Sequence, residues 1–229
     1  MKKLLLISNS ILYGQGYLEH CKSDIRNFLK GIKEILFIPY ALKDYDAYAK
    51  TVNDYFSTID ISVKGIHTTD PQTSIVEASS LFIGGGNTFR LLNELYKLDI
   101  IEAIRERVIN GMPYIGSSAG VNVACPTIKT TNDMPIVYPP SFNGLNLIPF
   151  QINPHYIDAD PRSTHQGETR EQRLKEFCEE NNQSVIGLRE GAWFWIENER
   201  TTLKGKTGAK LFKQDGTTYE FKEGDIVEI

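Results

Sequence analysis

The sequence is poor in cysteine and lacks any long apolar run. Its three cysteines are an odd number without the close spacing of a zinc site, which predicts reduced thiols and a cytoplasmic protein. A membrane helix needs about 18 or more apolar residues in a row, and no segment approaches that length. The apolar run near the N-terminus already stops at Ile7, so it predicts a buried strand rather than a signal peptide.

Positive charge is not in excess either. The chain has 25 lysines and arginines against 29 aspartates and glutamates, which gives a formal charge of −4. A nucleic-acid-binding face needs cations to neutralise phosphates, so this class of function is disfavoured. Apolar residues make up 41% of the 229 residues, and no repeat or low-complexity stretch interrupts the chain. We therefore expect one globular domain over residues 1–229.

Short apolar segments alternate with amphipathic ones through the first half of the chain. In residues 45–59, apolar side chains recur every three or four positions, as they do on one face of a helix. Five strand-then-helix units in a row favour an α/β fold with a mostly parallel sheet, helices on both faces and ligands at the carboxyl ends of the strands. The expected strands are 3–7, 34–39, 62–68, 80–83 and 113–115, and the expected helices are 17–29, 45–59, 73–78, 87–98 continuing over 99–109, and the segment after 118.

The pattern changes after residue 125. Five prolines lie between residues 126 and 149 without periodicity, which indicates an ordered loop. Residues 150–153 and 184–188 are typical of strands, and residues 169–178 of an amphipathic helix. From residue 193, short strands alternate with turns, and we expect them to extend one edge of the main sheet.

A corner of small residues, Gly116-Ser117-Ser118-Ala119-Gly120, joins a predicted strand to a predicted helix. In a G-x-S-x-G elbow, the serine lies on a tight turn that exposes its hydroxyl, and glycines remove Cβ atoms that would clash there. Ser118 is therefore the candidate nucleophile. The N–H of Ala119 would face an oxyanion that develops at the same corner. The alternative is a turn without chemistry.

A second glycine run, Gly84-Gly85-Gly86-Asn87, follows the fourth predicted strand. It lacks the spacing of a dinucleotide-binding motif and the lysine of a P-loop. In hydrolases with this kind of sheet, such a run supplies the second oxyanion N–H, and we assign Gly86 to that role. A tight turn into a helix, or a phosphate cradle in a binding protein, would use the same residues.

A serine nucleophile needs a base, and the sequence has four histidines. His20 and His67 belong to early elements, and His165 to a loop. Only His155 follows a predicted strand directly, after Asn153 and Pro154, which places it at the carboxyl edge of the sheet. His155 is therefore the expected base.

Two carboxylates could orient the imidazole of His155. Asp133 precedes the histidine in the chain, and Glu190 follows the predicted strand 184–188. The sequence does not choose between them. Asp158 and Asp160 lie close after His155, but they have no partner cluster with metal-ligand spacing, so no metal site is expected.

The motifs occur together in one order: GGGNTF (84–89), YIGSSAGVNVACPTIKTTNDMPIV (114–137), QINPHY (151–156) and GETREQRL (167–174). In these runs, and over nearly the whole chain, the sequence resembles the peptidase E family of α-aspartyl dipeptidases. The resemblance implies a sheet related to that of class I glutamine amidotransferases, with serine in place of cysteine. It also implies a cytoplasmic, cofactor-free serine peptidase that hydrolyses dipeptides with an N-terminal aspartate.

The resemblance also implies roles for single residues. It makes Ser118 the nucleophile and His155 the base, and it matches Asp133 to the third member of the triad, with Glu190 as the rival. Gly86 and Ala119 are the residues expected at the oxyanion. Arg170 and Asn87 are those expected at the substrate. Arg170 would hold the aspartate side chain, since a planar guanidinium can bind a carboxylate through two parallel hydrogen bonds.

Two features complicate the resemblance. Ser117 stands where the family commonly has tryptophan, which places a second hydroxyl beside Ser118. Arg173 lies three residues after Arg170 and so on roughly the same helix face. A cyanophycinase-like hydrolase on the same scaffold is the alternative enzyme, and it would need a groove lined with acids.

Overall fold

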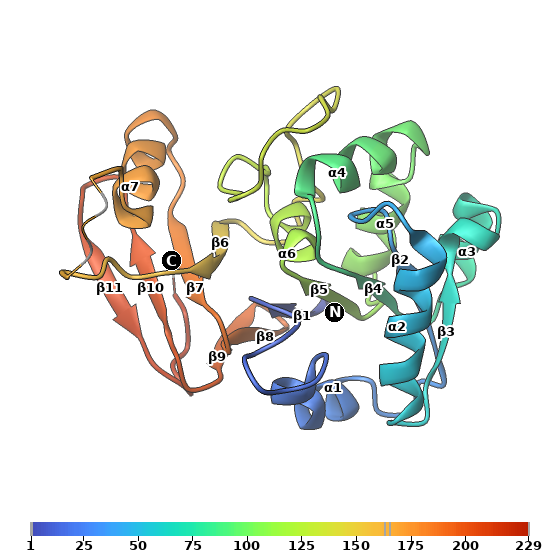
Figure 1. The fold of residues 1–229 in the computed structure, drawn as a ribbon. Coiled ribbons are helices and arrows are strands. Elements are labelled where there is room, and N and C mark those ends of the chain that lie inside the picture. The colour runs from blue at the N-terminus through green and yellow to red at the C-terminus, as the bar shows by residue number, and fades with distance from the viewer. Residues whose placement is uncertain (1, 163, 165, 229) are drawn as a thin grey trace.

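The computed structural model describes residues 2–162, 164 and 166–228, so His165 lies outside the described residues. The described strands form two sheets (Figure 1). The main sheet has seven strands in the order β3-β2-β4-β5-β1-β8-β9, and the second has four in the order β11-β10-β7-β6. Within this part of the chain, no helix has the length and apolar character needed to cross a bilayer.

The first five strands of the main sheet run parallel, as predicted. They are β1 (Lys3–Ile7), β2 (Glu34–Ile38), β3 (Ser62–Gly65), β4 (Leu81–Ile83) and β5 (Tyr114–Ser117). At the free edge of β1, the antiparallel strands β8 (Trp193–Glu197) and β9 (Arg200–Lys204) complete the sheet. Because β5 lies in the middle, the corner at Ser118 opens at the centre of the carboxyl edge.

Helices cover both faces of this sheet, as the sequence predicts. Side chains alternate along a strand, so Leu4 and Leu6 of β1 belong to one buried cluster and Leu5 and Ile7 to another. The first cluster includes buried residues of α3 (Pro71–Glu77), α4 (Thr88–Lys97), α5 (Ile101–Ile109) and α6 (Ala119–Ala124). The second includes residues of α1 (Lys22–Phe28) and α2 (Tyr45–Ser57). Short 3₁₀ turns, η1 (Glu19–Cys21) and η2 (Ile66–Thr68), precede α1 and α3.

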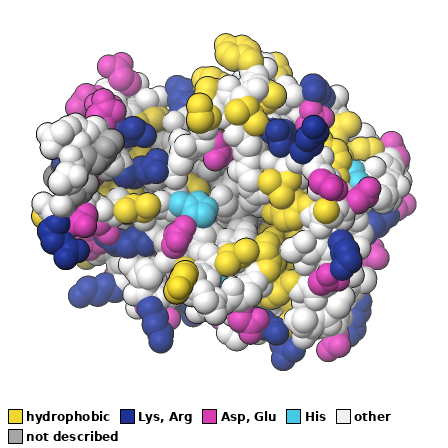
Figure 2. Space-filling view, viewed as in Figure 1, with side chains coloured by type: hydrophobic (Ala, Val, Ile, Leu, Met, Phe, Trp, Pro, Cys, Tyr) yellow, Lys and Arg dark blue, Asp and Glu magenta, His cyan; other side chains and the backbone are white. Residues whose placement is uncertain are grey.

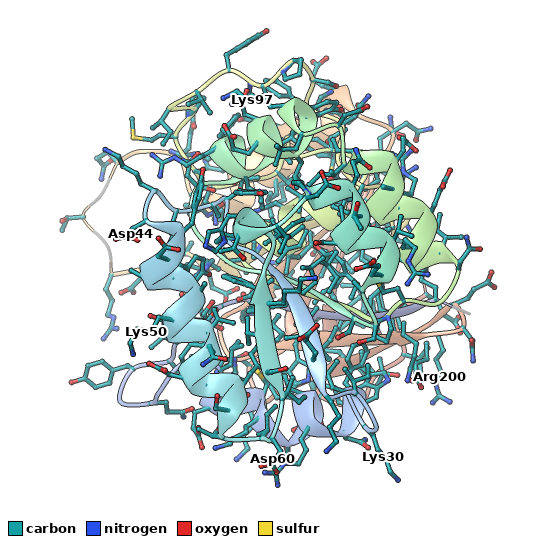
Figure 3. The ribbon with its side chains drawn as sticks, turned by 90° about the vertical axis from the view of Figure 1, so that its right-hand side faces the viewer. Lys30, Asp44, Lys50, Asp60, Lys97 and Arg200 are labelled. Atoms are coloured by element: carbon teal, nitrogen blue, oxygen red, sulfur yellow. The ribbon has the colours of Figure 1, made fainter. Side chains whose placement is uncertain are left out.

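Helix α2 shows how the sequence sets these boundaries. Asp44 caps its N-terminus by accepting a hydrogen bond from the N–H of Ala47, which satisfies one of the free amides of the first turn. Figure 3 shows Asp44 at the start of α2 and Asp60 just beyond its end. The buried face carries Tyr48, Val52 and Phe56, at the three- and four-residue spacing seen in the sequence.

The second sheet corrects one prediction about the tail. The sheet contains β6 (Gln151–Tyr156), β7 (Val185–Arg189), β10 (Ala209–Phe212) and β11 (Thr218–Phe221), with α7 (Arg170–Glu180) beside it (Figure 1). Strands β8 and β9 extend the main sheet as expected, but β10 pairs with β7 instead. The chain leaves the main sheet between Gly205 and Gly208, both at positive φ, and this bend turns β10 toward β7. One buried cluster includes residues of both sheets.

The proline-rich segment is an ordered loop, as predicted. Its described residues 126–149 contain no helix or strand, apart from an isolated bridge between Thr127 and Asn143. Arg105 holds it by donating from Nε to the carbonyl of Leu145 at 2.7 Å. Asn87 donates to the carbonyl of Met134 at 2.9 Å. The loop is thereby fixed against α4 and α5, next to the carboxyl ends of the strands.

Candidate active site

Ser118 lies at the sharp corner between β5 and α6. Its φ of 53° and ψ of −108° are unusual for a residue with a side chain, and such strain is common at active sites. The flanking glycines permit the corner, because a Cβ on Gly116 would lie 2.6 Å from the Gly120 carbonyl oxygen and one on Gly120 would lie 2.1 Å from that of Ile83. The half-buried Ser118 side chain lines a hollow that opens to solvent.

The neighbouring hydroxyl of Ser117 points elsewhere. Ser117 is the last residue of β5 and is fully buried. Its Oγ lies 2.8 Å from Oγ of Ser10, in the segment that follows β1. The two adjacent serines therefore have separate surroundings, and only Ser118 lines the hollow.

His155 lies in a bulge of β6. Pro154 pairs with Leu188 of β7 and Tyr156 pairs with Arg189, so His155 is the extra residue, with a φ of 53°. Bulges of this kind re-aim a side chain. Here the imidazole Nε2 lies 3.0 Å from Ser118 Oγ.

Ser8, which sequence reasoning did not single out, supports this bulge. Its hydroxyl accepts a hydrogen bond from the N–H of His155 at 2.9 Å and donates to the carbonyl of Leu188 at 2.8 Å. The side chain is fully buried at the carboxyl end of β1. The signal in the sequence is the polar run Ser8-Asn9-Ser10 directly after an apolar strand, since that is where ligand-binding edges lie in parallel sheets.

The structure separates the two candidate carboxylates. Glu190, the residue after β7, has Oε1 at 2.6 Å from His155 Nδ1. Asp133 instead accepts hydrogen bonds from the N–H of Thr88 at 2.7 Å and from the hydroxyl of Thr131 at 3.2 Å. Its carboxylate thus lies at the N-terminus of α4, where the helix dipole favours negative charge.

Glu190, His155 and Ser118 form a hydrogen-bonded chain that can move a proton. A proton on Nδ1 would be donated to the carboxylate, and Nε2 would then accept from the Ser118 hydroxyl. This arrangement can activate an alcohol as a nucleophile near neutral pH. The imidazole is 36% exposed and the Glu190 side chain 50% exposed, so the chain of groups lies at the protein surface.

The glycine run after β4 passes beside the Ser118 corner. A Cβ on Gly85 would lie 3.1 Å from the Ser118 Cβ, and one on Gly86, at a φ of 132°, would lie 2.6 Å from the Ala41 carbonyl oxygen. A side chain at Gly86 would be strained and would clash, and one at Gly85 would be tightly packed against Ser118. Ala119 begins α6, so its N–H is one of the first amides of the helix, which have no acceptor within it.

Asn87 serves the fold in this structure. Its Oδ1 accepts from the N–H of Arg90 at 3.0 Å, which caps α4, and its Nδ2 donates to the carbonyl of Met134. Both polar atoms of the side chain are therefore engaged within the protein. The role of Asn87 at the substrate stays a prediction, since each of its two polar atoms can form one further hydrogen bond.

Arg170 starts α7 and lines a hollow of about 260 Å³ that is distinct from the one at Ser118. Its Nη1 donates to Oδ1 of Asn132, and Asn132 donates from Nδ2 to the carbonyl of Pro154 at 2.8 Å. The arginine is thus connected to the residue that precedes His155. Burial and, next, the nearby Arg173 lower the pKa of Arg170 from its ordinary value. Arg173 lines the same hollow and pairs with Glu168 at 3.5 Å.

A further ion cluster joins the ends of β6 and β7. Arg189 donates from Nε and Nη2 to the two oxygens of Asp158, at 2.6 and 2.9 Å, and it also binds Glu220 of β11. The hydrogen bonds to Arg189 hold the pKa of Asp158 below its usual value, although burial opposes this. The ion pair with Arg189 therefore accounts for the position of the Asp158 carboxylate. The described residues contain no group of three or more potential metal ligands.

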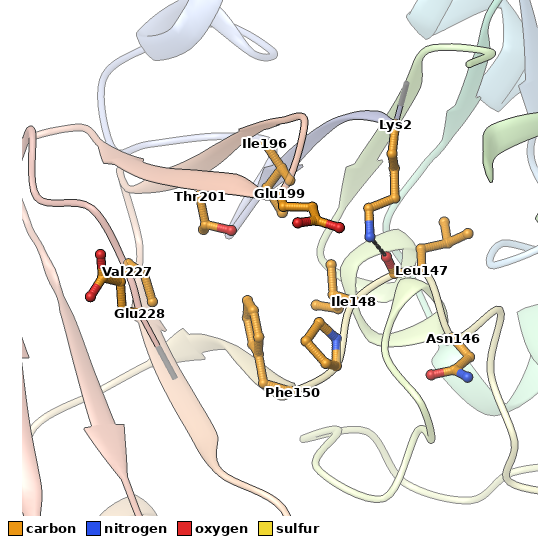
Figure 4. Close-up of a pocket in the computed structure, with 11 residues that line it drawn as sticks. Lys2, Asn146, Leu147, Ile148, Phe150, Ile196, Glu199, Thr201, Val227 and Glu228 are labelled. Atoms are coloured by element: carbon orange, nitrogen blue, oxygen red, sulfur yellow. Dashed lines mark hydrogen bonds between the residues drawn. The ribbon is translucent and has the colours of Figure 1, made fainter. Parts of the chain in front are cut away.

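Another hollow among the described residues includes none of these groups. It has a volume of about 640 Å³ and is lined by residues of β8 and β9, the segment 146–150 and the C-terminal residues Val227 and Glu228 (Figure 4). Lys2 projects into it and donates to the carbonyl of Leu147 at 2.6 Å. Burial lowers the pKa of Lys2, while Glu199 opposes that change.

Comparisons with known proteins find relatives over nearly the whole chain. Residues 4–204 match the family described as Peptidase family S51. The chain is 50% identical over 228 residues to a "Peptidase E" of Streptomyces coelicolor, which covers 99% of this chain and 94% of that one. It is 49% identical over 223 residues to a "Probable alpha-aspartyl dipeptidase" of Drosophila melanogaster, with 96% and 93% covered.

Solved structures share the fold. A putative peptidase E protein from Listeria monocytogenes superposes with a TM-score of 0.70 at 22% identity, over 90% of this chain and 100% of that one. A peptidase from an acI-B1 actinobacterium gives a TM-score of 0.74 at 14% identity, over 100% and 97%. At these identities the likeness concerns the fold alone.

Proposed function

This chain belongs to peptidase family S51 and is a serine peptidase, and we propose that it is an α-aspartyl dipeptidase that hydrolyses dipeptides with an N-terminal aspartate. The observation that carries the mechanism is the chain of contacts at the carboxyl edge of the sheets. His155 lies 3.0 Å from Ser118 Oγ through one ring nitrogen and 2.6 Å from Glu190 through the other.

The reaction follows the general scheme of serine acyl transfer. Ser118 Oγ attacks the peptide carbonyl carbon while His155 Nε2 takes the hydroxyl proton. His155 then gives that proton to the leaving amine as the C–N bond breaks, which leaves an acyl-enzyme on Ser118. A water molecule then gives a proton to the same imidazole and attacks the acyl-enzyme, and His155 returns that proton to Ser118 Oγ as the ester bond breaks and aspartate leaves.

Backbone amides would stabilise the negative charge on the carbonyl oxygen. We assign the N–H groups of Gly86 and Ala119 to this role. The assignment of Gly86 is supported by its place in the hollow that Ser118 lines and by the close approach of its neighbour Gly85 to Ser118. Loss of one such donor typically costs about 10²–10³ in kcat.

Of the two carboxylates, we assign Glu190 to orient His155. Its 2.6 Å contact with Nδ1 supports this, because a carboxylate there fixes the tautomer and stabilises the imidazolium. Asp133 is given a structural role at the N-terminus of α4, where it also holds the loop that follows Ser118.

Arg170 is the proposed ligand of the substrate's aspartate side chain. One of its nitrogens is engaged by Asn132, and that contact ties the guanidinium to the strand end that bears His155. A guanidinium remains charged at any physiological pH and suits a carboxylate better than an amide. Three buried free cysteines support action in a reducing compartment, for which we propose the cytoplasm.

A substrate panel tests this function. Asp-Leu, Asn-Leu, Glu-Leu and N-acetyl-Asp-Leu are incubated with the protein in the presence of a chelator, and the released leucine is measured. We expect Asp-Leu to exceed Asn-Leu in kcat/KM by at least tenfold, because the amide cannot form the ion pair. Equal rates for Asp-Leu and Asn-Leu would refute the aspartyl specificity.

A further inference from the structure

A hollow of about 550 Å³ lies directly beside the candidate nucleophile. Its lining includes Gly85, Gly86, Ser118 and His155, so a substrate that reacts with Ser118 lies next to this space. The rest of the wall comes from the segment after β1 and from the start of α2. Those two segments have no part in the chemistry described above.

This outer wall is mainly apolar. Ile11 is 59% exposed and Leu42 is 40% exposed, although both are large hydrophobic side chains. Tyr17 and Tyr48 lie behind them, with their hydroxyls 3.5 Å apart, and burial raises the pKa of both phenols, so they are neutral. Apolar side chains also gather over the centre of this face in Figure 2. Exposed apolar walls that converge on a few polar groups are characteristic of ligand pockets.

The charges in this hollow do not suit an acidic side chain. Its described lining contains no lysine or arginine, and Asp44 is its one carboxylate. Asp44 already accepts a hydrogen bond from Ala47 as the cap of α2. Arg170 and Arg173 line a separate hollow beside α7, together with the carboxylates of Asp158, Asp160 and Glu168. The structure thus has an apolar hollow that includes Ser118 and His155, and a separate charged hollow that contains Arg170.

We propose that the apolar hollow receives the side chain of the leaving residue, so that the enzyme favours Asp-X dipeptides in which X is large and apolar. This inference rests on the proposed function. Because His155 protonates the leaving nitrogen, the residue attached to that nitrogen lies beside the imidazole, which is part of this wall. The free carboxylate of that residue points out to water through the open mouth.

The first test compares Asp-Leu and Asp-Phe with Asp-Gly on the unmodified protein. We expect kcat/KM to be about tenfold or more higher for the two apolar leaving residues, since each buried methylene alone favours binding several-fold. A ratio of Asp-Leu to Asp-Gly within twofold of unity would overturn the proposal. If Asp-Leu and Asp-Gly were still strongly preferred over Asn-Leu, the aspartyl dipeptidase function would be supported and only the apolar subsite would be wrong.

The second test uses variants of the outer wall. Ile11→Ser and Leu42→Ser should each lower the ratio of kcat/KM for Asp-Leu to that for Asp-Gly by about threefold to tenfold. Tyr13→Ala is the matched control, because Tyr13 is fully exposed in the same segment as Ile11 and does not line the hollow. An unchanged ratio in both serine variants would overturn the proposal.

A third comparison separates the two subsites. If Leu-Leu were hydrolysed faster than Asp-Leu, the apolar hollow would hold the first residue of the dipeptide, and both the subsite and the aspartyl specificity would be wrong. If Leu-Leu is a poor substrate and Asp-Leu a good one, the assignment of Arg170 to the first residue and of the apolar hollow to the second is supported.

Discussion

The carboxylate of Glu190 contacts His155 Nδ1 at 2.6 Å, while the carboxylate of Asp133 accepts hydrogen bonds from Thr88 and Thr131. The two acids are equally plausible partners by their order in the chain. Their surroundings differ, because one follows a strand beside His155 and the other meets the first turn of α4. The Glu190 carboxylate is therefore placed to orient His155, as we propose, and the Asp133 carboxylate to stabilise the start of α4.

Replacing Glu190 by glutamine should lower kcat by about 10⁴-fold, because the amide can donate to Nδ1 and so favour the wrong imidazole tautomer. Steady-state kinetics with Asp-Leu measure this. The melting temperature should change little, since the Glu190 side chain is half exposed.

Asp133→Asn is the matched comparison. It weakens the contact with the N–H of Thr88, so stability should fall by about 1 kcal/mol, with kcat affected far less than in the glutamine variant. Thermal unfolding and kinetics on both variants are compared side by side. A larger loss of kcat in Asp133→Asn than in Glu190→Gln would contradict our assignment of the orienting acid.

Ser118→Ala should remove measurable hydrolysis of Asp-Leu and all labelling by a fluorophosphonate, which reacts only with an activated serine. Ser117→Ala should retain most of the activity and lose about 1 kcal/mol of stability, since it breaks the buried contact with Ser10. Labelling of Ser118→Ala, or loss of labelling in Ser117→Ala, would show that the other hydroxyl is the nucleophile.

Arg170→Met should fold normally and lose the preference for Asp-Leu over Asn-Leu. The ratio of kcat/KM for the two substrates should fall toward one, because the remaining contacts treat the carboxylate and the amide alike. Arg173→Met is the control, as it removes a guanidinium from the same hollow. If the ratio collapses in the Arg173 variant and not in the Arg170 variant, the aspartate side chain binds Arg173.

The pair of Asp158 and Arg189 should make stability depend on pH in the acid range. The pKa of Asp158 is lowered in the folded protein from its ordinary value of 3.8, so its stabilising effect is fully present above that pH and is lost as the pH falls through the folded pKa. Wild type should therefore exceed Asp158→Asn in melting temperature at pH 6, and the difference should shrink below about pH 4.

Asp160→Asn removes a carboxylate from the same segment and serves as the reference, because Asp160 contacts only the highly exposed Arg162 among its described partners. A difference between wild type and Asp158→Asn that stays constant from pH 6 to pH 3 would contradict the ion-pair explanation.

Local signals predicted much of the fold. The apolar strands, the helix faces and the glycine corners each depend on neighbouring residues, and the parallel sheet with helices on both faces is confirmed. The pairing of β10 with β7 was not predictable, because the residues of a hairpin turn do not determine which sheet the following strand joins. The choice between Glu190 and Asp133 was not predictable either, because it depends on how α4 packs against the loop. The pairing of Asp158 with Arg189 likewise joins residues that are distant in the chain and that the register between β6 and β7 brings together.

The Ser8 hydroxyl contacts His155 and Leu188, which lie 147 and 180 residues further along the chain. A polypeptide that ends before residue 188 would lack the carbonyl to which the Ser8 hydroxyl donates. During synthesis from the N-terminus, this pair of hydrogen bonds can therefore be completed only after Leu188 has been added.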